Sequence, residues 1–350
     1  MSLRELLGQP SALAVLSSAL EKGELHHALR FEGPPGVGKE LAAFGVAMAS
    51  ACTSDDPLGC GHCEGCRRAV TFAEGPPAVP IHPDVVLIER GRYADLLRDG
   101  GRKIEERTEI SIQQVRQIIQ PQVTYSASEA KRRIFIIRRA EEMSIGAANA
   151  LLKTLEEPRP GNHFILLTSR PDSLLPTIRS RTMPIRFAPL PSSVMRTLLT
   201  KNGVEESRHD ELVDLAQGSI EAALELAGAE SAGEKSTFVK AIEKAICIGT
   251  PGAATQFAES APSDRHNCRQ ALIGYAAHLA RRSRTLLQNG GNPDDARRAA
   301  EGYSHLLRVL ADMEEFNGSP AMQLGALVLE LAERGVVPPE ERAAAVGRAR

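Results

Sequence analysis

The sequence has no long hydrophobic run. No segment approaches the roughly 18 consecutive apolar residues that a membrane-spanning helix requires. The first residues, Met1 to Pro10, also lack the basic region, apolar region and cleavage site of a secretory signal peptide. Both absences predict a cytoplasmic protein.

Charge of one sign is not in excess either. Among 350 residues, 42 lysines and arginines face 44 aspartates and glutamates, which gives a formal net charge of -2. A protein that holds nucleic acid unaided usually has a strongly basic face, so this balance argues against an autonomous nucleic-acid-binding module. Apolar residues at 42% and charged residues at 25% are typical of globular proteins. The length allows two or three domains, each with its own core.

Cysteine is scarce, but four of the six cysteines crowd into one short segment. In a reducing compartment such clustering favours a metal site over disulfides. Four thiolates give a closed tetrahedral site, which predicts a structural Zn²⁺ with an iron–sulfur cluster or unliganded thiols as alternatives. His62 could replace one thiolate, although its place beside Cys60 makes this awkward, and Cys247 and Cys268 are expected in the core. The predicted metal ligands are Cys52, Cys60, Cys63 and Cys66.

Short apolar runs alternate with helical patterns over the first 190 residues. Continuous apolar runs of this length are typical of buried strands, and their alternation with helices predicts a parallel α/β sheet. After Pro191 no convincing strand pattern occurs, and the remaining sequence predicts a small and a larger helical domain. The runs expected to form strands are 28–31, 84–88, 134–137, 164–168 and 183–187.

One glycine-rich segment has the pattern of a phosphate-binding P-loop. Gly33-Pro34-Pro35-Gly36-Val37-Gly38-Lys39 lies between a predicted strand and a predicted helix, which is the context that a P-loop requires. The backbone N–H groups around Gly33, Gly36 and Gly38 would hold phosphate oxygens, and Lys39 would neutralise their charge. The next residue is Glu40, so the hydroxyl that holds Mg²⁺ in active P-loop proteins is absent.

A second element of an ATPase site is also missing. An active site needs an acidic residue at the end of a strand beside the P-loop, but the run 134–137 is followed by Arg138 and Arg139. Cations there would repel Mg²⁺, although both arginines could instead form ion pairs within the chain, with Glu141, Glu142 or Asp84 as the candidates. We therefore expect no intrinsic ATP hydrolysis, whereas the complete glycine loop is compatible with weak nucleotide binding without turnover.

Two further motifs resemble a known family. Asn-Ala-Leu-Leu-Lys-Thr-Leu-Glu-Glu-Pro at 149–158 and Leu-Pro-Thr-Ile-Arg-Ser-Arg at 175–181 are similar to the bacterial clamp loader, an AAA+ family. Leu25-His26-His27-Ala28 and the four-cysteine insertion extend the resemblance over most of the first 190 residues. The resemblance implies an AAA+ P-loop domain at 1–190 with a zinc module at 52–66, a helical lid domain at 191–229, a helical collar domain at 230–340 and a tail at 341–350.

The departures at Glu40 and Arg138 resemble the delta-prime class of DNA polymerase III subunits rather than the motor subunits gamma and tau. In that class the family has a rigid stator with a degenerate nucleotide site. Ser180-Arg181-Thr182 is similar to the family's Ser-Arg-Cys motif, which implies that Arg181 is an arginine finger acting in trans on a neighbour's ATP. The resemblance also implies a five-subunit ring with motor subunits and a delta subunit, acting on a sliding clamp and primed DNA. An active ATPase of the gamma/tau type is the alternative.

Overall fold

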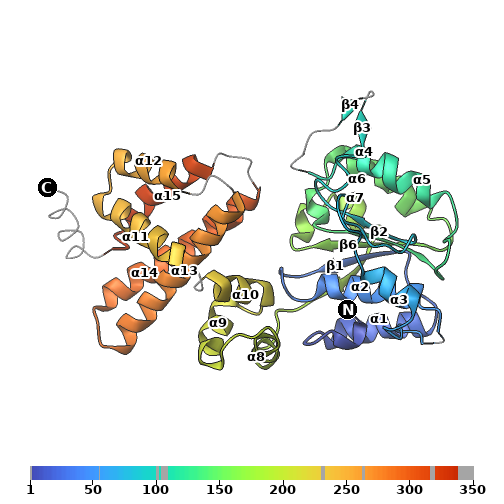
Figure 1. The fold of residues 1–350 in the computed structure, drawn as a ribbon, viewed down its shortest axis with the longest axis horizontal. Coiled ribbons are helices and arrows are strands. Elements are labelled where there is room, and N and C mark those ends of the chain that lie inside the picture. The colour runs from blue at the N-terminus through green and yellow to red at the C-terminus, as the bar shows by residue number, and fades with distance from the viewer. Residues whose placement is uncertain are drawn as a thin grey trace. The chain divides into compact units, whose positions relative to one another are not determined.

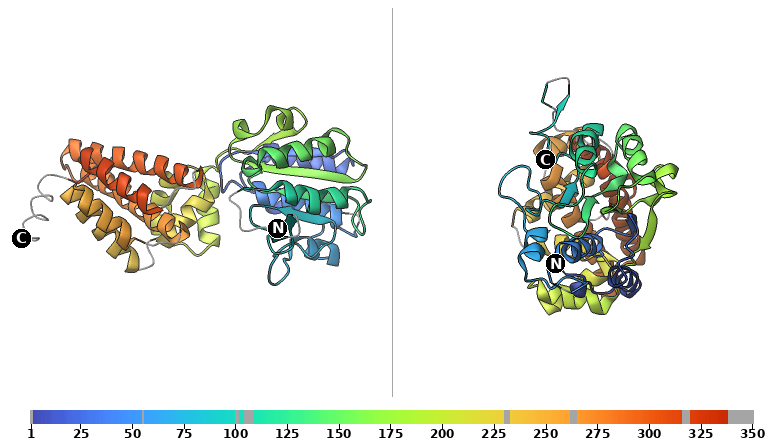
Figure 2. Two further views of the ribbon diagram at one scale, coloured as in Figure 1. Left: turned by 90° about the horizontal axis from the view of Figure 1, so that it is seen from above. Right: turned by 90° about the vertical axis from the view of Figure 1, so that its right-hand side faces the viewer.

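The computed structural model describes residues 2–54, 56–99, 102–103, 109–229, 233–261, 265–315 and 320–337. The predicted tail at 341–350 lies outside these residues. The chain divides into two compact units, Met1–Met195 and Arg196–Arg350, whose elements are drawn in Figure 1 and Figure 2. Whether the helical residues after Pro191 form two domains, as expected, stays a prediction.

The first unit is built on a parallel five-stranded sheet with the order β2-β5-β6-β1-β7. Because all strands run in the same direction, their carboxyl ends meet at one edge of the sheet. This confirms the expected parallel α/β architecture. A short antiparallel pair, β3 (Arg98–Asp99) and β4 (Arg102–Lys103), was not predicted. The sheet strands are β1 (Ala28–Glu32), β2 (Val85–Ile88), β5 (Arg133–Ile137), β6 (Asn162–Thr168) and β7 (Met183–Arg186).

Helices cover both faces of the sheet, which gives a three-layered unit. On one face α1 contacts β7, while α2 contacts β5 and β6. On the other face the buried side chains of α6, such as Leu151, pack with those of β5 and β6, such as Phe135 and Phe164. The helices are α1 (Pro10–Glu21), α2 (Lys39–Ala51), α3 (Glu64–Val70), α6 (Ile145–Glu156) and α7 (Pro176–Arg179).

The helical segment that begins after Ser111 is interrupted. Ser111 caps its start, because the Ser111 Oγ accepts the N–H of Gln114 at 3.4 Å while the Gln114 Oε1 accepts the N–H of Ser111 at 3.0 Å. A wider π-helical turn then separates the two ends. The physical reason is Pro121, which has no N–H to donate to the preceding turn. The pieces are α4 (Ile112–Gln114), a π-helical turn (Val115–Ile119) and α5 (Gln120–Val123).

Every regular element in the described part of the second unit is a helix, as expected. Its α13 and α14 are joined by a short loop, with Gly290 in the left-handed region at φ 68°, and they pack against each other. One helix, α12, was not predicted, although Thr250 and Pro251 at its start are typical beginning signals. The helices after the sheet are α8 (Ser192–Lys201), α9 (His209–Ala216), α10 (Ile220–Ala229), α11 (Gly233–Ile248), α12 (Pro251–Ser260), α13 (Arg265–Gln288), α14 (Pro293–Glu315) and α15 (Pro320–Glu333).

None of the described helices is both long enough and apolar enough to cross a membrane.

Candidate functional site

The P-loop residues connect β1 to α2 at the carboxyl edge of the sheet. Gly33 has φ 153°, and a Cβ atom there would lie 2.3 Å from the carbonyl oxygen of Phe187. Only glycine therefore fits this approach between the loop and the segment after β7. Because α2 begins at Lys39, the loop leads directly into a helix N-terminus. Backbone N–H groups at such an end form the anion-binding arrangement that the motif predicts.

The Lys39 ammonium is turned back onto its own loop. It donates hydrogen bonds to the carbonyl oxygens of Gly33 at 2.5 Å and of Pro34. Two of the three N–H donors of this ammonium are thus used by carbonyl oxygens of the loop itself. The lysine is thus positioned at the loop but engaged within it.

Arg138, directly after β5, contacts Glu40 directly. The guanidinium forms one ion pair with Glu40 and another with Glu89, whose Oε2 lies 2.7 Å from Arg138 Nη1. Burial by itself lowers the pKa of Arg138, but the Coulomb attraction of Glu40 and the hydrogen bond to Glu89 outweigh it and raise this pKa. The arginine therefore stays charged, and the two residues that depart from an active P-loop site are partners of each other.

The remaining charged residues of this region are also engaged. Arg139 pairs with Glu142 at 3.3 Å, one of the ion pairs considered from the sequence. For Arg138 that expectation was wrong, because its partners are Glu40 and Glu89. The Oε1 atom of Glu141 accepts hydrogen bonds from the backbone N–H and the hydroxyl of Ser169 at 3.2 and 2.9 Å. This contact ties Glu141 to the segment after β6.

Glu89 is a residue of this candidate site that the sequence reasoning missed. It directly follows β2, which pairs with β5 in the sheet, so Glu89 and Arg138 leave neighbouring strands at the same edge. An acidic residue at the end of a predicted parallel strand was the available signal. That signal could not be used without knowing which strands are neighbours.

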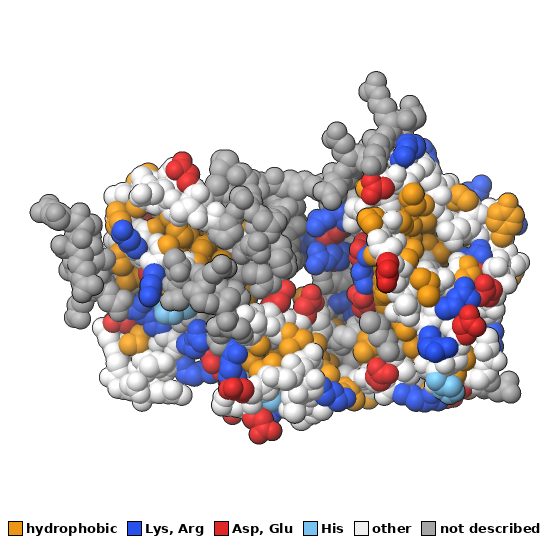
Figure 3. Space-filling view, in the orientation of Figure 1, with side chains coloured by type: hydrophobic (Ala, Val, Ile, Leu, Met, Phe, Trp, Pro, Cys, Tyr) orange, Lys and Arg blue, Asp and Glu red, His pale blue; other side chains and the backbone are white. Residues whose placement is uncertain are grey.

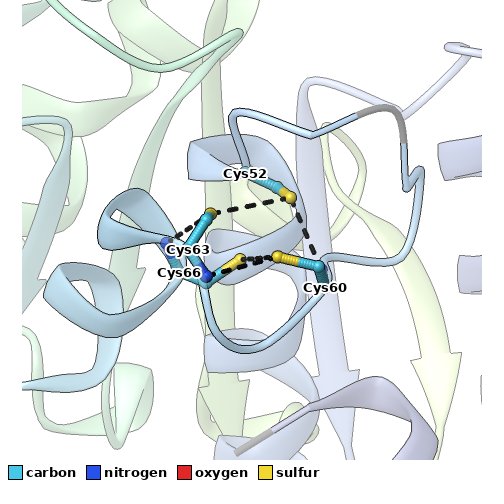
Figure 4. A group of neighbouring side chains, drawn as sticks. All are labelled: Cys52, Cys60, Cys63 and Cys66. Carbon is cyan, nitrogen blue, oxygen red and sulfur yellow. Dashed lines mark hydrogen bonds between the residues drawn. The ribbon is translucent and has the colours of Figure 1, made fainter.

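The four clustered cysteines converge, as Figure 4 shows. Their sulfur atoms all lie within 4.8 Å of one another. The Sγ atoms of Cys60 and Cys66 are 3.9 Å apart, and so are those of Cys52 and Cys63. Disulfide bonding requires about 2.05 Å. A tetrahedral ion with metal–sulfur bonds of about 2.3 Å needs sulfur atoms about 3.8 Å apart, so these four side chains fit one metal ion.

Backbone hydrogen bonds favour the thiolate at Cys60 and Cys63, whereas burial raises the pKa of Cys66. The N–H groups of Cys60, Cys63 and Cys66 each lie 3.4 Å from the sulfur of an earlier cysteine. Burial alone would raise the pKa of Cys63, but the N–H of Cys66 and the hydroxyl and backbone of Thr53 lower it to about 5. Thiolate is the form that binds metal. The first turn of α3 also requires glycine, because a Cβ on Gly65 would lie 2.0 Å from the Ala51 carbonyl oxygen.

His62 and the other two cysteines do not belong to the cluster. His62 lies outside the cluster, and its Nδ1 is 2.9 Å from the carbonyl oxygen of Cys60. Cys268 is buried, as expected for a core residue. Cys247, which was also expected in the core, is only partly buried. It lies in the last turn of α11, where the helix ends at Ile248.

Arg181 follows α7 and borders an open groove with a volume of about 670 Å³, whose walls include His26, His27 and Glu156. Its Nη2 lies 2.7 Å from Glu156 Oε1, and its Nη1 donates to the carbonyl oxygen of Thr177 at 3.0 Å. The Arg181 side chain is 35% exposed. An ion pair this accessible contributes about 0–1 kcal/mol, so another anion can displace the carboxylate.

The two histidines beside Arg181 stack with ring centroids 4.4 Å apart. Burial, together with the charge of His26, lowers the pKa of His27. His27 is therefore neutral near pH 7, and Arg181 supplies the lasting positive charge of the groove. Neither histidine joins the cysteine cluster among the described residues.

Basic and acidic side chains are intermixed on the face drawn in Figure 3. Hydrophobic side chains gather over α4 and α6 on the same face. Ile145, the first residue of α6, is 71% exposed. The visible face therefore lacks, over its described residues, the single-sign patch that a free-standing nucleic-acid binder would present.

Comparison with known proteins identifies the family of this chain. Residues 8–191 match the family model described as DNA polymerase III, delta subunit. The chain is 34% identical over 201 residues to DNA polymerase III subunit gamma/tau of Mycobacterium tuberculosis, covering 57% of this chain and 31% of that protein. It is 31% identical over 215 residues to subunit delta' of Bacillus subtilis, covering 61% and 58%. The chain thus spans less than two thirds of the length of these relatives.

Among solved structures, a DNA polymerase III gamma subunit-related protein of Thermotoga maritima aligns with 91% of this chain and 99% of that chain, with a TM-score of 0.47 and 18% identity. The parallel sheet, the P-loop residues after β1 and the helical second unit agree with the architecture expected from the sequence. Since the family model matches more than half of the residues, the chain belongs to the DNA polymerase III delta subunit family.

Proposed function

We propose that this chain is a delta-prime-type stator of the bacterial DNA polymerase III clamp loader. It does not hydrolyse ATP, and it supplies Arg181 in trans to the ATP site of a neighbouring motor subunit during loading of the sliding clamp. The observation that carries this proposal is the ion pair between Glu40 and Arg138.

The pair acts against Mg²⁺ in two ways. Mg²⁺ in a P-loop ATPase is held by a hydroxyl after the lysine and by a neighbouring acidic residue. Here the hydroxyl is replaced by Glu40, and its carboxylate is neutralised by Arg138. The guanidinium also places a positive charge, only 23% exposed, beside the P-loop helix. Like charges a few ångström apart repel strongly in partly buried surroundings, so a divalent cation is disfavoured there.

Arg181 has the properties that an arginine finger needs. The guanidinium is permanently charged and planar, and it can bind phosphate oxygens with two N–H groups. It lies in an open groove and is held by accessible contacts with Glu156, the Thr177 carbonyl oxygen and the Ser180 hydroxyl. A neighbour's ATP phosphate can therefore replace Glu156 as its partner.

The four-cysteine module is proposed to hold a structural Zn²⁺. Cys52, Cys60, Cys63 and Cys66 would supply all four ligands and leave no position for water or substrate. The ion would fix the segment between α2 and α3, and it would take no part in ATP chemistry.

The partners proposed for this subunit are gamma or tau motor subunits and a delta subunit in a five-membered ring. The sliding clamp and primed DNA would be reached through the assembled ring. We place the assembly in the cytoplasm. The gamma/tau and delta' relatives support this set of partners.

The test is reconstitution with candidate motor subunits. Arg181→Ala should lower turnover at the adjoining ATP site by about 10³–10⁵-fold, because an arginine finger stabilises the transition-state charge. Arg186→Ala is the matched control, since that side chain is 88% exposed and lies on β7 close by in the sequence. Single-turnover measurements on the assembled ring would resolve the affected site. Equal rates for Arg181→Ala and wild type would overturn the proposal.

A second candidate, an active gamma/tau-type ATPase, is favoured by the 34% identity to the gamma/tau relative and by the complete glycine loop. It predicts ATP turnover by the purified chain alone that Lys39→Ala abolishes. The stator proposal predicts no such turnover.

A further inference from the structure

We infer that Arg30 and Thr182 are positioning residues that fix the segment carrying Arg181. The inference rests on the proposed role of Arg181. It assigns to two buried side chains the task of holding the backbone on either side of the finger.

Arg30 is a charged residue in a strand that is otherwise buried by apolar contacts. It lies in the middle of β1, between β6 and β7, and its side chain is only 8% exposed. Because side chains alternate along a strand, Arg30 and Glu32 share one face of the sheet. The Arg30 Nε donates to Glu32 Oε1 at 2.5 Å, so the charge is balanced where it is buried.

The other end of the guanidinium reaches the segment after α7. Arg30 Nη1 donates to the Thr182 hydroxyl at 2.6 Å and to the Arg179 carbonyl oxygen at 2.9 Å. The Thr182 hydroxyl in turn donates to the carbonyl oxygen of Ile178 at 2.9 Å. Thr182 is 5% exposed, so water cannot readily replace these bonds.

These contacts hold the backbone on either side of Arg181, whereas the Arg181 guanidinium can exchange its partners. The residue two positions before Arg181 and the residue after it, Arg179 and Thr182, are both tied to Arg30 on the central sheet. The Arg181 guanidinium itself makes only accessible contacts in the groove. A phosphate of a neighbouring subunit can therefore bind the Arg181 guanidinium without moving the backbone of residues 179–182. Catalysis by positioning needs such a fixed backbone, because a misplacement of about 1 Å can cost on the order of 10²-fold in rate.

The hydroxyl of Thr182 is the part that this role requires. Thr182→Val keeps the branched shape but removes both the acceptor for Arg30 and the donor to Ile178. Thr182→Ser keeps the hydroxyl and removes only a methyl group. Thr124→Val is the matched control, because the Thr124 hydroxyl is exposed and donates to the Gln120 carbonyl oxygen at 3.1 Å, away from this segment.

Two measurements test the inference. The first is finger-dependent ATP turnover in the reconstituted assembly, where Thr182→Val should lower kcat by about 10–10²-fold with the KM for ATP unchanged. The second is hydrogen–deuterium exchange on the full chain alone, where the same variant should speed exchange of the Ser180 and Arg181 amides. Thr182→Ser should restore both measurements, and Thr124→Val should alter neither.

The outcomes separate this inference from the proposed function. If Arg181→Ala leaves turnover unchanged, the finger role fails, while exchange still reports whether Thr182 holds the segment. If Arg181→Ala lowers turnover but Thr182→Val does not, or if Thr182→Ser fails to restore it, the positioning role is overturned. Should Thr182→Val not fold, Arg30→Lys replaces it, since lysine keeps the charge but cannot bond Glu32 and Thr182 in the same fork geometry. Wild-type kcat and exchange in that variant would equally overturn the inference.

Discussion

Glu40 and Arg138 form an ion pair across 98 residues of sequence. Each is the residue that departs from an active P-loop site, one after the loop lysine and one after β5. Because they are in contact, each of these two departures from the motif supplies the charge that neutralises the other. The pair cancels two charges that would each be unfavourable alone beside the loop, because a partly buried charge without a partner is costly.

The first prediction follows from that contact. The double variant Glu40→Thr with Arg138→Asp restores a hydroxyl and a carboxylate and removes the competing guanidinium. We expect it to bind ATP at least about tenfold more tightly with Mg²⁺ than without, since both Mg²⁺-holding groups are then present. Titration with a fluorescent ATP analogue, with and without Mg²⁺, would measure this.

The single variants serve as controls. Glu40→Thr alone leaves the Arg138 cation, still paired with Glu89, so no Mg²⁺-dependent gain is expected. Arg138→Asp alone places a third carboxylate near Glu40 and Glu89 and should lower stability. A wild-type chain whose ATP binding is strengthened tenfold by Mg²⁺ would contradict the interpretation of the site.

The second prediction concerns the metal. The purified chain should contain one Zn²⁺, and Cys63→Ser should lose it, because three remaining thiolates leave the tetrahedral site open. The melting temperature should fall by several degrees as the loop between α2 and α3 loses its cross-link. Metal analysis and thermal unfolding measure the two effects. Replacement of Zn²⁺ by Co²⁺ should give the absorption of four thiolates bound to cobalt in wild type but not in Cys63→Ser.

Cys247→Ser is the control for that experiment, since Cys247 lies outside the cluster. It should retain the metal in full. Iron and acid-labile sulfide in place of zinc would support the iron–sulfur alternative and contradict the zinc proposal.

The sequence predicted the parts of the fold that depend on local pattern. Buried parallel strands are continuous apolar runs, so β5 and β6 could be located within one or two residues. The cysteine spacing predicted the one group of side chains among the described residues whose geometry could hold a metal ion. Glycine spacing likewise located the P-loop between a strand and a helix.

What the sequence could not provide was the order of the strands and the partners that this order creates. Glu89 meets Arg138 only because β2 lies beside β5, and Arg30 meets Thr182 only because β1 lies beside β7. Both contacts link residues far apart in the chain, and no local pattern encodes such pairing. The departures of Glu40 and Arg138 from the P-loop pattern could therefore be recognised in the sequence, but the ion pair between them could not be foreseen.

The third prediction concerns Asp84, whose carboxylate is completely buried at the start of β2. It accepts the N–H groups of Ser128, Glu129 and Ala130 at distances from 2.7 to 2.9 Å, and Arg133 Nη2 lies 2.9 Å away. Burial alone would raise the pKa of Asp84, but the three N–H groups and Arg133 outweigh it and lower this pKa below its ordinary value.

The sign of the pH dependence follows from that lowered pKa. The unfolded chain has an aspartate pKa of about 3.9, so the ionised carboxylate contributes its full stabilisation above about pH 4. This contribution disappears as pH falls through the lower pKa of the folded chain. Asp84→Asn, which leaves Arg133 with no carboxylate, should lower the free energy of unfolding by about 3–5 kcal/mol at pH 7.

Urea unfolding of wild type and Asp84→Asn at pH 7, 5 and 3 measures the difference between the two free energies. That difference should be the same at pH 7 and 5, and smaller at pH 3, where the wild-type chain gains a proton on unfolding. Asp172→Asn is the control, because this side chain is 95% exposed and its ion pair with Arg179 contributes about 0–1 kcal/mol. A difference for Asp84→Asn that grows on acidification would require the opposite pKa shift, and the carboxylate would then have to be protonated in the folded chain.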